Sequence, residues 1–369
     1  MRKEATAAGV VPVAAPSLQR ARSRHFLAFV VLANLLAFTA CAAVGELAVR
    51  WWREGSLRAA IASLTSERPV PRSLGTGDWL QADATRGYVL RAGVHGTNSL
   101  GLRHPELIAP KPASVFRLLV LGDSVAFPAD GFVARIRAAC APAATTTEVV
   151  NAATPGYTTH QERLHLEALV AEVAPDAVLL QYCCNDNHRF LHRLTDTGGW
   201  LITEDARRAL LPEDGGVIAR IARWSYLVLE ARRLMLAHRP RDRIFPWRDD
   251  PAFAAAWRAD TWPLVDGEIL RMRDVAAAHG ARFAVVAVPY EPQLSDVALA
   301  ADRAHALVPQ ARLAALCDRA GIAFLDLHAA FASARSQGLY TDGIHLTARG
   351  HEVAATSIVP FLRAHGLLR

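Results

Sequence analysis

Three short segments carry side chains that together can perform chemistry. Ser124 ends the segment LVLGDS, Asn185 lies in CCNDN, and Asp342 and His345 lie close together in YTDGIHLT. A serine hydroxyl is a weak nucleophile that needs an adjacent base, and an imidazole can be that base. A carboxylate can hold the imidazole in one tautomer and stabilise its protonated form. These residue types predict acyl transfer by a triad of Ser124, His345 and Asp342.

Acyl transfer also needs hydrogen-bond donors directed at the oxyanion of the tetrahedral intermediate. The candidates are the backbone N–H groups of Ser124 and Gly156 and the side-chain amide of Asn185. Gly156 lies in NAATPGYTT, where the missing side chain lets the backbone approach an acyl group closely. We expect these three residues to form an oxyanion hole.

Metal binding is the chemical alternative for Asp342 and His345. A second histidine at a suitable ligand spacing is missing, since His351 is expected to face outward on the last helix. His188 and His192 would form a pair on one helix face if their segment were helical. We favour the triad, and we expect no metal ligands.

An alternation of apolar strands and helical segments has to position these residues. VFRLLVLG, EVVNAA, DAVLLQY, ARFAVVAVP and IAFLDL have the apolar pattern of five buried strands, separated by segments of helical periodicity. This order predicts βαβ units with right-handed crossovers, and therefore a three-layer α/β fold. The candidate residues follow strand ends, where such sheets bind ligands. We expect Ser124 at the start of a helix, and a last helix from Thr347 to about Leu362.

The segment of about 187–262 interrupts this alternation, and we expect a helical insertion with no clear strand. We consider three roles for its aromatic side chains: they form the walls of a substrate site, they contact the membrane surface, or they anchor the insertion to the domain. They are Trp200, Trp224, Tyr226, Phe245, Trp247, Trp257 and Trp262.

The N-terminal region contains an uncharged apolar run, FLAFVVLANLLAFTACAAVG, at residues 26–45. At about 1.5 Å per helical residue, its length matches a hydrocarbon core of about 30 Å. Arg20, Arg22 and Arg24 precede the run, so the positive-inside rule places the rest of the chain outside the cytoplasm. Trp51 and Trp52 fit an interfacial anchor. We favour an uncleaved single-span membrane anchor.

Three alternatives to this anchor remain open. A signal peptide could be cleaved near Ala40–Ala43, although the apolar run is long for that purpose. FTAC, which ends at Cys41, loosely resembles a lipoprotein processing site, with Phe38 a poor match. A buried soluble helix is the third alternative, and the absence of a polar face argues against it.

Composition narrows the remaining function classes. The 369 residues are 52% hydrophobic and 21% charged, which fits a large packed core, and the net charge of +6 is mild. No basic run is interleaved with aromatic residues, so we expect no nucleic-acid partner. No CxxC motif occurs, and we expect buried cysteines, although a Cys140–Cys317 disulfide stays open. The sequence does not indicate the oligomeric state.

The four motifs resemble those of the SGNH/GDSL hydrolases. VLGDSV carries the family's nucleophile at Ser124, NAATPGYTT its oxyanion glycine at Gly156, CCNDN its oxyanion Asn185, and YTDGIHLTARGH Asp342 and His345. TNSLGLR, at residues 97–103, resembles the lead-in of many bacterial members. The resemblance covers about residues 96–369 and implies a flavodoxin-like α/β/α sandwich with a five-stranded parallel sheet, ester hydrolysis, and no metal or organic cofactor. Cys184 departs from a frequent glycine, which makes Asn185 the least secure of the five site residues.

These expectations divide the chain into a basic cytoplasmic tail (1–25), a transmembrane helix (26–48), a tether and apron (49–112) and a hydrolase domain (113–369) with its insertion. We expect a membrane-anchored extracytoplasmic serine esterase that acts on O-acyl esters of envelope carbohydrate or lipid. Two alternatives are an O-acyltransferase that acts on envelope glycans and a non-catalytic envelope binding module.

Overall fold

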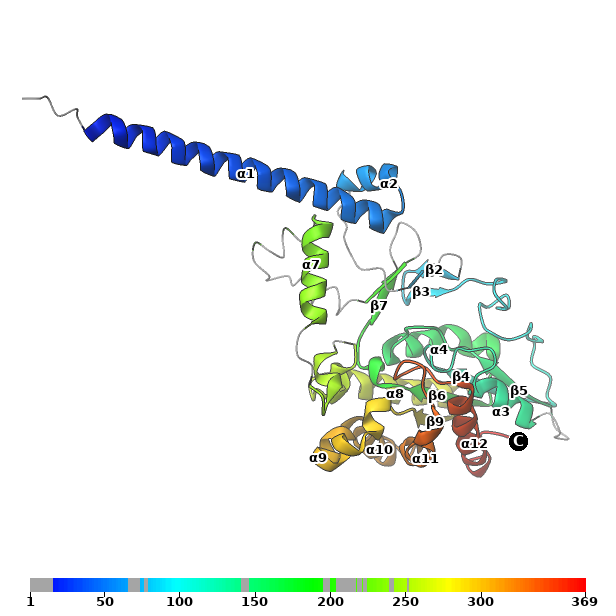
Figure 1. Cartoon of the computed structure of the whole chain (residues 1–369). Coiled ribbons are helices and arrows are strands. Elements are labelled where there is room, and N and C mark those ends of the chain that lie inside the picture. The colour runs from blue at the N-terminus through cyan, green and yellow to red at the C-terminus, as the bar shows by residue number, and fades with distance from the viewer. Residues whose placement is uncertain are drawn as a thin grey trace, which may run out of the picture. The chain divides into compact units, whose positions relative to one another are not determined.

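The computed structural model describes residues 16–65, 74–75, 79–140, 146–194, 200–203, 217, 221, 224–238, 242–250 and 252–369. The chain forms two compact units (Figure 1). One contains residues 1–69 and 214–237, and the other contains residues 70–213 and 238–369. We describe each unit separately.

The second unit is built on a parallel sheet of five strands, which confirms the predicted α/β fold. The strand order is β10–β9–β6–β4–β5, and every neighbouring pair is parallel. The strands are β4 (Val115–Leu121), β5 (Thr146–Asn151), β6 (Ala177–Tyr182), β9 (Arg282–Ala287) and β10 (Ala323–Asp326). The chain passes from β4 to β5 on one side and later returns to β6 on the other side of β4. Such a reversal of strand order is where open α/β sheets bind ligands.

Helices cover both faces of this sheet (Figure 1). The apolar side chains of β4 divide between two core clusters, Leu118 and Val120 in one and Leu119 and Leu121 in the other. This division explains why the strand reads as a continuous apolar run rather than an alternating one. The helices are α3 (Phe132–Cys140), α4 (Thr159–Val173), α8 (Trp262–Ala278), α9 (Asp296–Ala306), α10 (Val308–Ala320), α11 (His328–Ala334) and α12 (Ala348–Ala364).

The cysteine residues do not form a disulfide. All five are free, and Cys140 and Cys317 belong to the core clusters on opposite faces of the sheet. Short 3-10 turns complete the unit: η2 (Cys184–Asp186), η3 (Pro246–Asp249), η4 (Ala254–Trp257), η5 (Glu291–Leu294) and η6 (Arg335–Gln337).

The last helix begins where the sequence predicts, but one of its side chains faces the other way. Thr347 is the N-cap of α12, and its side chain accepts a hydrogen bond from the Gly350 N–H. His351 does not face outward as expected: it is buried, and its Nδ1 accepts a hydrogen bond from the Phe132 N–H at 3.2 Å. The reason is packing, because α12 lies against α3 and His351 falls on the packed side.

The expectation of an insertion without strands is wrong. β7 (His192–Leu194) pairs with β8 (Trp200–Thr203), and β8 pairs with β1 (Leu74–Gly75), all antiparallel. A second hairpin joins β2 (Leu80–Asp83) to β3 (Gly87–Leu90). These strands are too short to show a clear period of two in the sequence.

The insertion's aromatic residues in this unit anchor it to the domain. Trp247 and Trp262 are fully buried, and Trp257 stacks on Trp247 at 4.5 Å between ring centroids. The indole N–H of Trp262 donates to the Ala256 carbonyl, and that of Trp257 donates to the His305 carbonyl. The burial of Trp247 and Trp262 and the paired N–H groups of Trp257 and Trp262 support the anchoring alternative for these three side chains.

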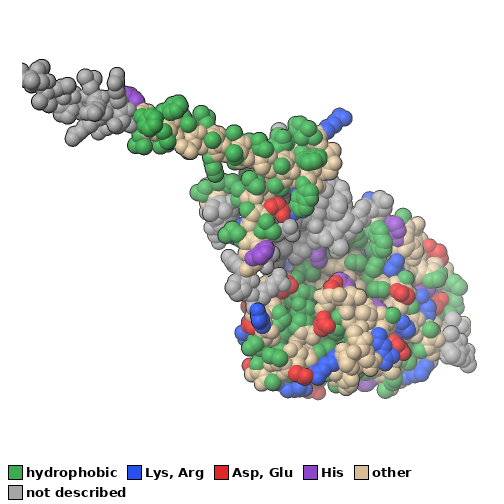
Figure 2. Space-filling model, in the orientation of Figure 1, with side chains coloured by type: hydrophobic (Ala, Val, Ile, Leu, Met, Phe, Trp, Pro, Cys, Tyr) green, Lys and Arg blue, Asp and Glu red, His purple; other side chains and the backbone are tan. Residues whose placement is uncertain are grey.

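The first unit is dominated by the long helix α1 (Pro16–Glu54). Its segment His25–Glu54 is long and apolar enough to cross a membrane, and none of its most apolar stretch is buried inside the protein. Figure 2 shows a nearly continuous surface of apolar side chains along this helix. The helices α2 (Leu57–Ala62) and α7 (Tyr226–Ala237) and the turn η1 (Ser63–Thr65) complete the described part of this unit.

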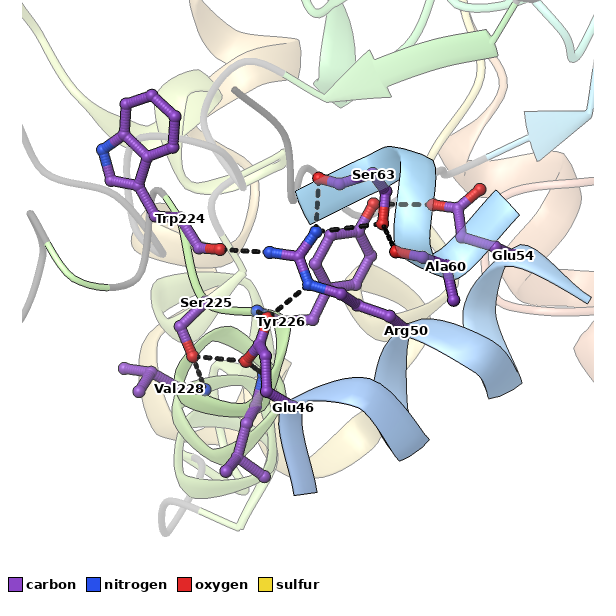
Figure 3. Close-up of polar contacts among 10 residues, drawn as sticks. Glu46, Arg50, Glu54, Ala60, Ser63, Trp224, Ser225, Tyr226 and Val228 are labelled. Carbon is purple, nitrogen blue, oxygen red and sulfur yellow. Dashed lines mark hydrogen bonds and ion pairs between the residues drawn. The ribbon is translucent and has the colours of Figure 1, made fainter. Parts of the chain in front are cut away.

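A polar network just beyond the apolar run joins α7 to α1 (Figure 3). The Glu46 carboxylate accepts hydrogen bonds from the Tyr226 N–H at 2.9 Å and the Leu227 N–H at 3.0 Å, so a side chain of α1 caps the first turn of α7. Arg50, only 2% exposed, donates to Glu46 and to the backbone carbonyls of Ser63 and Trp224. Arg50 and Glu46 form an ion pair within α1. Hydrogen bonds between this pair and the backbone at the start of α7 join the two helices.

Candidate active site

The loop after β4 presents Ser124. Asp123 folds this loop through its Oδ1, which accepts a hydrogen bond from the Val125 N–H at 2.9 Å. The loop does not lead directly into a helix, because α3 begins only at Phe132. The expectation that Ser124 sits at a helix N-terminus is therefore wrong. A carboxylate-stabilised turn, rather than the first turn of a helix, exposes the hydroxyl.

A second loop, between α11 and α12, presents Asp342 and His345. Its ends pair through an antiparallel bridge between Tyr340 and Leu346. Asp342 Oδ1 accepts hydrogen bonds from the backbone N–H groups of Ile344 and His345, at 3.2 and 2.9 Å. This turn fixes the backbone of both residues and leaves Asp342 Oδ2 free to meet the imidazole.

The two loops bring a hydroxyl, an imidazole and a carboxylate into one line. Ser124 Oγ lies 2.9 Å from His345 Nε2, and His345 Nδ1 lies 2.6 Å from Asp342 Oδ2. Burial raises the pKa of Asp342, but hydrogen bonds from the side chain and backbone of His345 outweigh it and bring the pKa below its usual value. The carboxylate is therefore charged at neutral pH and accepts the proton of His345 Nδ1.

Two backbone N–H groups and one side-chain amide are the candidate oxyanion donors. Among the described residues, the backbone N–H groups of Ser124 and Gly156 have no acceptor. Asn185 lies in η2, directly after β6, and its amide donates one hydrogen bond to Asp123 Oδ2 at 3.0 Å. An amide nitrogen carries two protons, so one stays available to a ligand.

The turn that carries Gly156 has no room for a side chain. Gly156 has φ of +74°, and a Cβ there would lie 2.6 Å from His192 Nδ1 and 3.0 Å from the Tyr88 hydroxyl. Tyr88 donates a hydrogen bond to the Pro155 carbonyl at 3.0 Å. Tyr88 and His192 come from β3 and β7, which the sequence analysis did not connect to the site. Only the steric demand for glycine hinted at such neighbours.

Cys184 does not displace Asn185. The Cys184 side chain is fully buried, and its Sγ lies 3.5 Å from Gln293 Oε1. The cysteine therefore points toward η5, while the next residue, Asn185, contacts Asp123. Burial raises the pKa of the Cys184 thiol, so the group is a neutral, apolar filler rather than a second nucleophile.

Three carboxyl groups are buried behind the Ser124 loop: Asp123, Glu162 and Asp186. Burial raises the pKa of each, and the charges of neighbouring carboxylates raise those of Glu162 and Asp186 further. Both oxygens of Glu162 and Oδ1 of Asp186 have no hydrogen-bond partner among the described residues. Burial and mutual repulsion therefore favour the protonated forms of Glu162 and Asp186.

The pH dependence of stability should report the proton on Glu162. Its pKa lies well above the ordinary value of 4.5, so the unfolded chain ionises first as the pH rises. As the pH rises from 4.5 to the folded pKa, this difference lowers the free energy of unfolding by up to about 1.4 kcal/mol per pH unit, so the folded protein becomes less stable. Glu162→Gln removes the ionisation, so the melting temperature of this variant relative to wild type should increase between pH 5 and pH 8.

The exposed Glu172 supplies the matched control. Glu172→Gln removes the same charge from the surface and should leave the melting-temperature difference nearly constant over this pH range. A constant difference for Glu162→Gln as well would show that Glu162 is already ionised in the folded protein.

The histidines considered as metal ligands have other contacts. The segment 188–192 is not helical, so His188 and His192 do not form a pair on one helix face. His188 Nε2 lies 2.9 Å from the Ala252 carbonyl, and His192 faces Gly156. The described residues contain no cluster of three or more histidine, cysteine or acidic side chains suited to a metal ion.

Residues 120–353 match the model of the GDSL-like lipase/acylhydrolase family. The chain belongs to this family. The match spans all five site residues, and a GDSL-like hydrolase is an enzyme that cleaves ester bonds. No curated protein matches the chain.

Solved structures with low sequence identity resemble this GDSL-like hydrolase over most of their length. TesA is 17% identical, with a TM-score of 0.41, and the match covers 67% of this chain and 98% of TesA. An acetylxylan esterase from Geobacillus stearothermophilus, Axe2, is 15% identical over 67% of this chain and 94% of its own, with a TM-score of 0.41. A lipase/acylhydrolase from Enterococcus faecalis is 13% identical over 69% and 97%, with a TM-score of 0.40.

Proposed function

We propose that the protein is a membrane-anchored serine esterase that removes O-acyl groups through an acyl-serine intermediate. The observation that carries this proposal is the continuous contact from Ser124 Oγ through His345 to Asp342 Oδ2. Ser124 is the nucleophile, and His345 Nε2 takes its proton during attack. Asp342 holds the imidazole with Nδ1 protonated and stabilises the charge that forms.

The tetrahedral intermediate places its oxyanion among the N–H groups of Ser124 and Gly156 and the free amide proton of Asn185. Support comes from the two backbone donors without an acceptor and from Asp123, which fixes the amide of Asn185. Donors held in place before the reaction stabilise developing charge without reorganisation.

Asn185→Ala should lower kcat for p-nitrophenyl acetate by about 10²–10³, the usual cost of losing one oxyanion donor. Its KM should change much less, because the ground-state carbonyl needs this donor less than the oxyanion does. Asn187→Ala is the matched control, since Asn187 follows in the same segment but bonds Tyr182 and Thr261 instead. Equal kcat values for both variants would remove Asn185 from the oxyanion hole.

Hydrolysis is favoured over acyl transfer to an alcohol by the exposure of the triad. The side chains of His345 and Asp342 are 44% and 54% exposed. Water can therefore reach the acyl-serine, with His345 as the base that activates it. A transferase must keep water away from its intermediate.

We propose O-acyl esters of envelope carbohydrate or lipid as substrates, because α1 can hold the enzyme at a membrane. The arginines before the apolar run favour a catalytic domain outside the cytoplasm. Alkaline phosphatase fused after Arg369 should be active in intact bacteria, and green fluorescent protein at the same site should stay dark. The reverse pair of results would overturn this topology.

Product analysis separates the two reactions. The purified full-length enzyme in detergent is incubated with an acetylated oligosaccharide in H₂¹⁸O, with and without an excess of unacetylated glycan. The esterase proposal predicts ¹⁸O-labelled acetate in both samples and no newly acetylated glycan. Acetyl transfer to the added glycan without acetate release would instead establish a transferase.

A further inference from the structure

A cavity of about 490 Å³, with both polar and apolar walls, adjoins the loop that carries Ser124 and has no role in the chemistry described above. Its walls come from residues 95–106, from the start and one face of α3, and from Ala129, in the same loop as Ser124. The volume is within the range of small-molecule sites. A cavity of this size holds one or two sugar residues.

The charges in this cavity are mostly positive. Arg103 and Arg137 both line it, and neither forms an ion pair among the described residues. Asp130 interacts with Arg103 electrostatically, without a hydrogen bond between them. The one acidic residue in the wall, Glu106, already accepts hydrogen bonds from the Ser99 N–H and Oγ, both at 2.7 Å. Partly buried guanidinium groups without a counter-ion favour binding of an anion.

Each guanidinium keeps unused donors. Arg137 donates from Nε and Nη2 to the Val149 carbonyl, and Arg103 donates from Nη1 to the Phe127 carbonyl and from Nη2 to the His95 carbonyl. These acceptors carry no net charge, so among the described residues no carboxylate is bonded directly to either guanidinium. A guanidinium has five N–H groups, which leaves both side chains able to bind a ligand oxygen.

The segment TNSLGLR positions Arg103 through hydrogen bonds within its own backbone turn. Asn98 Oδ1 accepts hydrogen bonds from the Leu100 and Leu102 N–H groups, both at 3.0 Å. Gly101 has φ of +74°, and a Cβ there would lie 2.7 Å from the Leu90 carbonyl oxygen. The segment is thus folded tightly around Asn98, and its last residue, Arg103, is directed to the cavity.

Two aromatic rings also contact the Arg103 guanidinium. Arg103 lies 4.3 Å from the centroid of the Phe127 ring and 5.5 Å from that of Trp79. Trp79 stacks on His95, which lines the cavity in the left-handed backbone conformation with φ of +50°. Strained residues of this kind gather at ligand sites, and a preorganised cation loses little entropy when it binds.

We propose that this cavity binds the carboxylate of an acidic sugar residue in the glycan that carries the ester. The proposal rests on the proposed function for the choice of a glycan. The two arginines in the cavity wall suit a uronate better than an acyl chain. The cavity would hold the polymer while a neighbouring acylated residue reaches Ser124.

Binding can be measured without hydrolysis, so this test is independent of the proposed function. Full-length Ser124→Ala protein in detergent is titrated calorimetrically with trigalacturonate and with a neutral trisaccharide of the same length. We expect the acidic trisaccharide to bind at least about tenfold more tightly, and its affinity to fall as salt is raised. Equal affinities, or no binding of trigalacturonate, would overturn the proposal.

Arginine variants locate the site. In the Ser124→Ala background, Arg137→Met should weaken trigalacturonate binding at least about tenfold, and Arg137→Lys should restore part of it. Arg91→Met is the matched control, because Arg91 is exposed and, within the described part of the chain, its guanidinium bonds only the Leu80 carbonyl. A variant is used only if its melting temperature equals that of the Ser124→Ala protein. Arg103→Met replaces Arg137→Met if the latter unfolds. Full binding by both Met variants would place the ligand elsewhere.

Inorganic phosphate offers the same negative oxygens without a sugar. We expect it to displace trigalacturonate only at concentrations far above those of the trisaccharide. Tight phosphate binding that is lost with Arg137→Met, together with weak trigalacturonate binding, would assign the cavity to a phosphate group and overturn the uronate assignment.

Discussion

Replacing Ser124 by alanine is expected to lower kcat for p-nitrophenyl acetate by at least about 10⁴, to the level of residual catalysis by the remaining site. The loss is this large because no second nucleophile lies in position. Both cysteines near the site, Cys183 and Cys184, are fully buried, and burial raises the pKa of each thiol. The measurement is steady-state hydrolysis by the detergent-solubilised full-length enzyme.

Ser333→Ala is a suitable control for this variant. Ser333 is an exposed helical serine whose hydroxyl bonds the Ala329 carbonyl in the same helix. It should retain wild-type turnover. Turnover by Ser124→Ala within about tenfold of wild type would remove Ser124 as the nucleophile.

The second large effect is expected from Asp342→Asn, which should lower kcat by about 10³–10⁴. The asparagine amide would donate to His345 Nδ1, and the imidazole would then carry its proton on Nε2. A protonated Nε2 faces Ser124 Oγ and cannot act as the base. The side-chain oxygen can still accept from the Ile344 and His345 N–H groups, so the loop should keep its fold.

Two further measurements separate this tautomer effect from a folding defect. The melting temperature should stay within a few degrees of wild type, and KM should change little because Asp342 contacts no substrate. A kcat within about threefold of wild type would show that the carboxylate does not set the tautomer of His345.

The proximity of Ser124, His345 and Asp342 could be expected from the sequence, because the topology of the sheet does most of the positioning. Ser124 follows β4 and Asn185 follows β6, and these strands are neighbours in a parallel sheet. Carboxyl ends of parallel strands meet at one edge, so an apolar run followed by a polar residue is informative without any contact map. The loop that contains YTDGIHLT brings Asp342 and His345 to the same edge.

Contacts made by side chains across the fold could not be predicted in the same way. The bond between Asn185 and Asp123 depends on the rotamers of two buried residues, and nothing in the spacing of their motifs indicates it. His351 was expected at the surface because a polar residue on a terminal helix usually faces water. Its hydrogen bond to the Phe132 N–H reverses that expectation.

The short strands of the insertion could not be predicted for a different reason. β7 is held by its pairing with β8, and its residue His192 packs against Gly156, so tertiary contacts rather than local pattern determine it. Strand propensity is weak in such segments, and packing decides the structure. The loop around Asn98 is similar, because its folded shape becomes evident only from the side-chain hydrogen bonds to Leu100 and Leu102.

The most direct measurement is peptide mapping of the enzyme after reaction with a fluorophosphonate, which labels activated serines. The account predicts one phosphonyl group per protein, on the peptide that contains Ser124, and loss of labelling in His345→Ala. A label on any other serine, or equal labelling of Ser124 in the absence of His345, would contradict it.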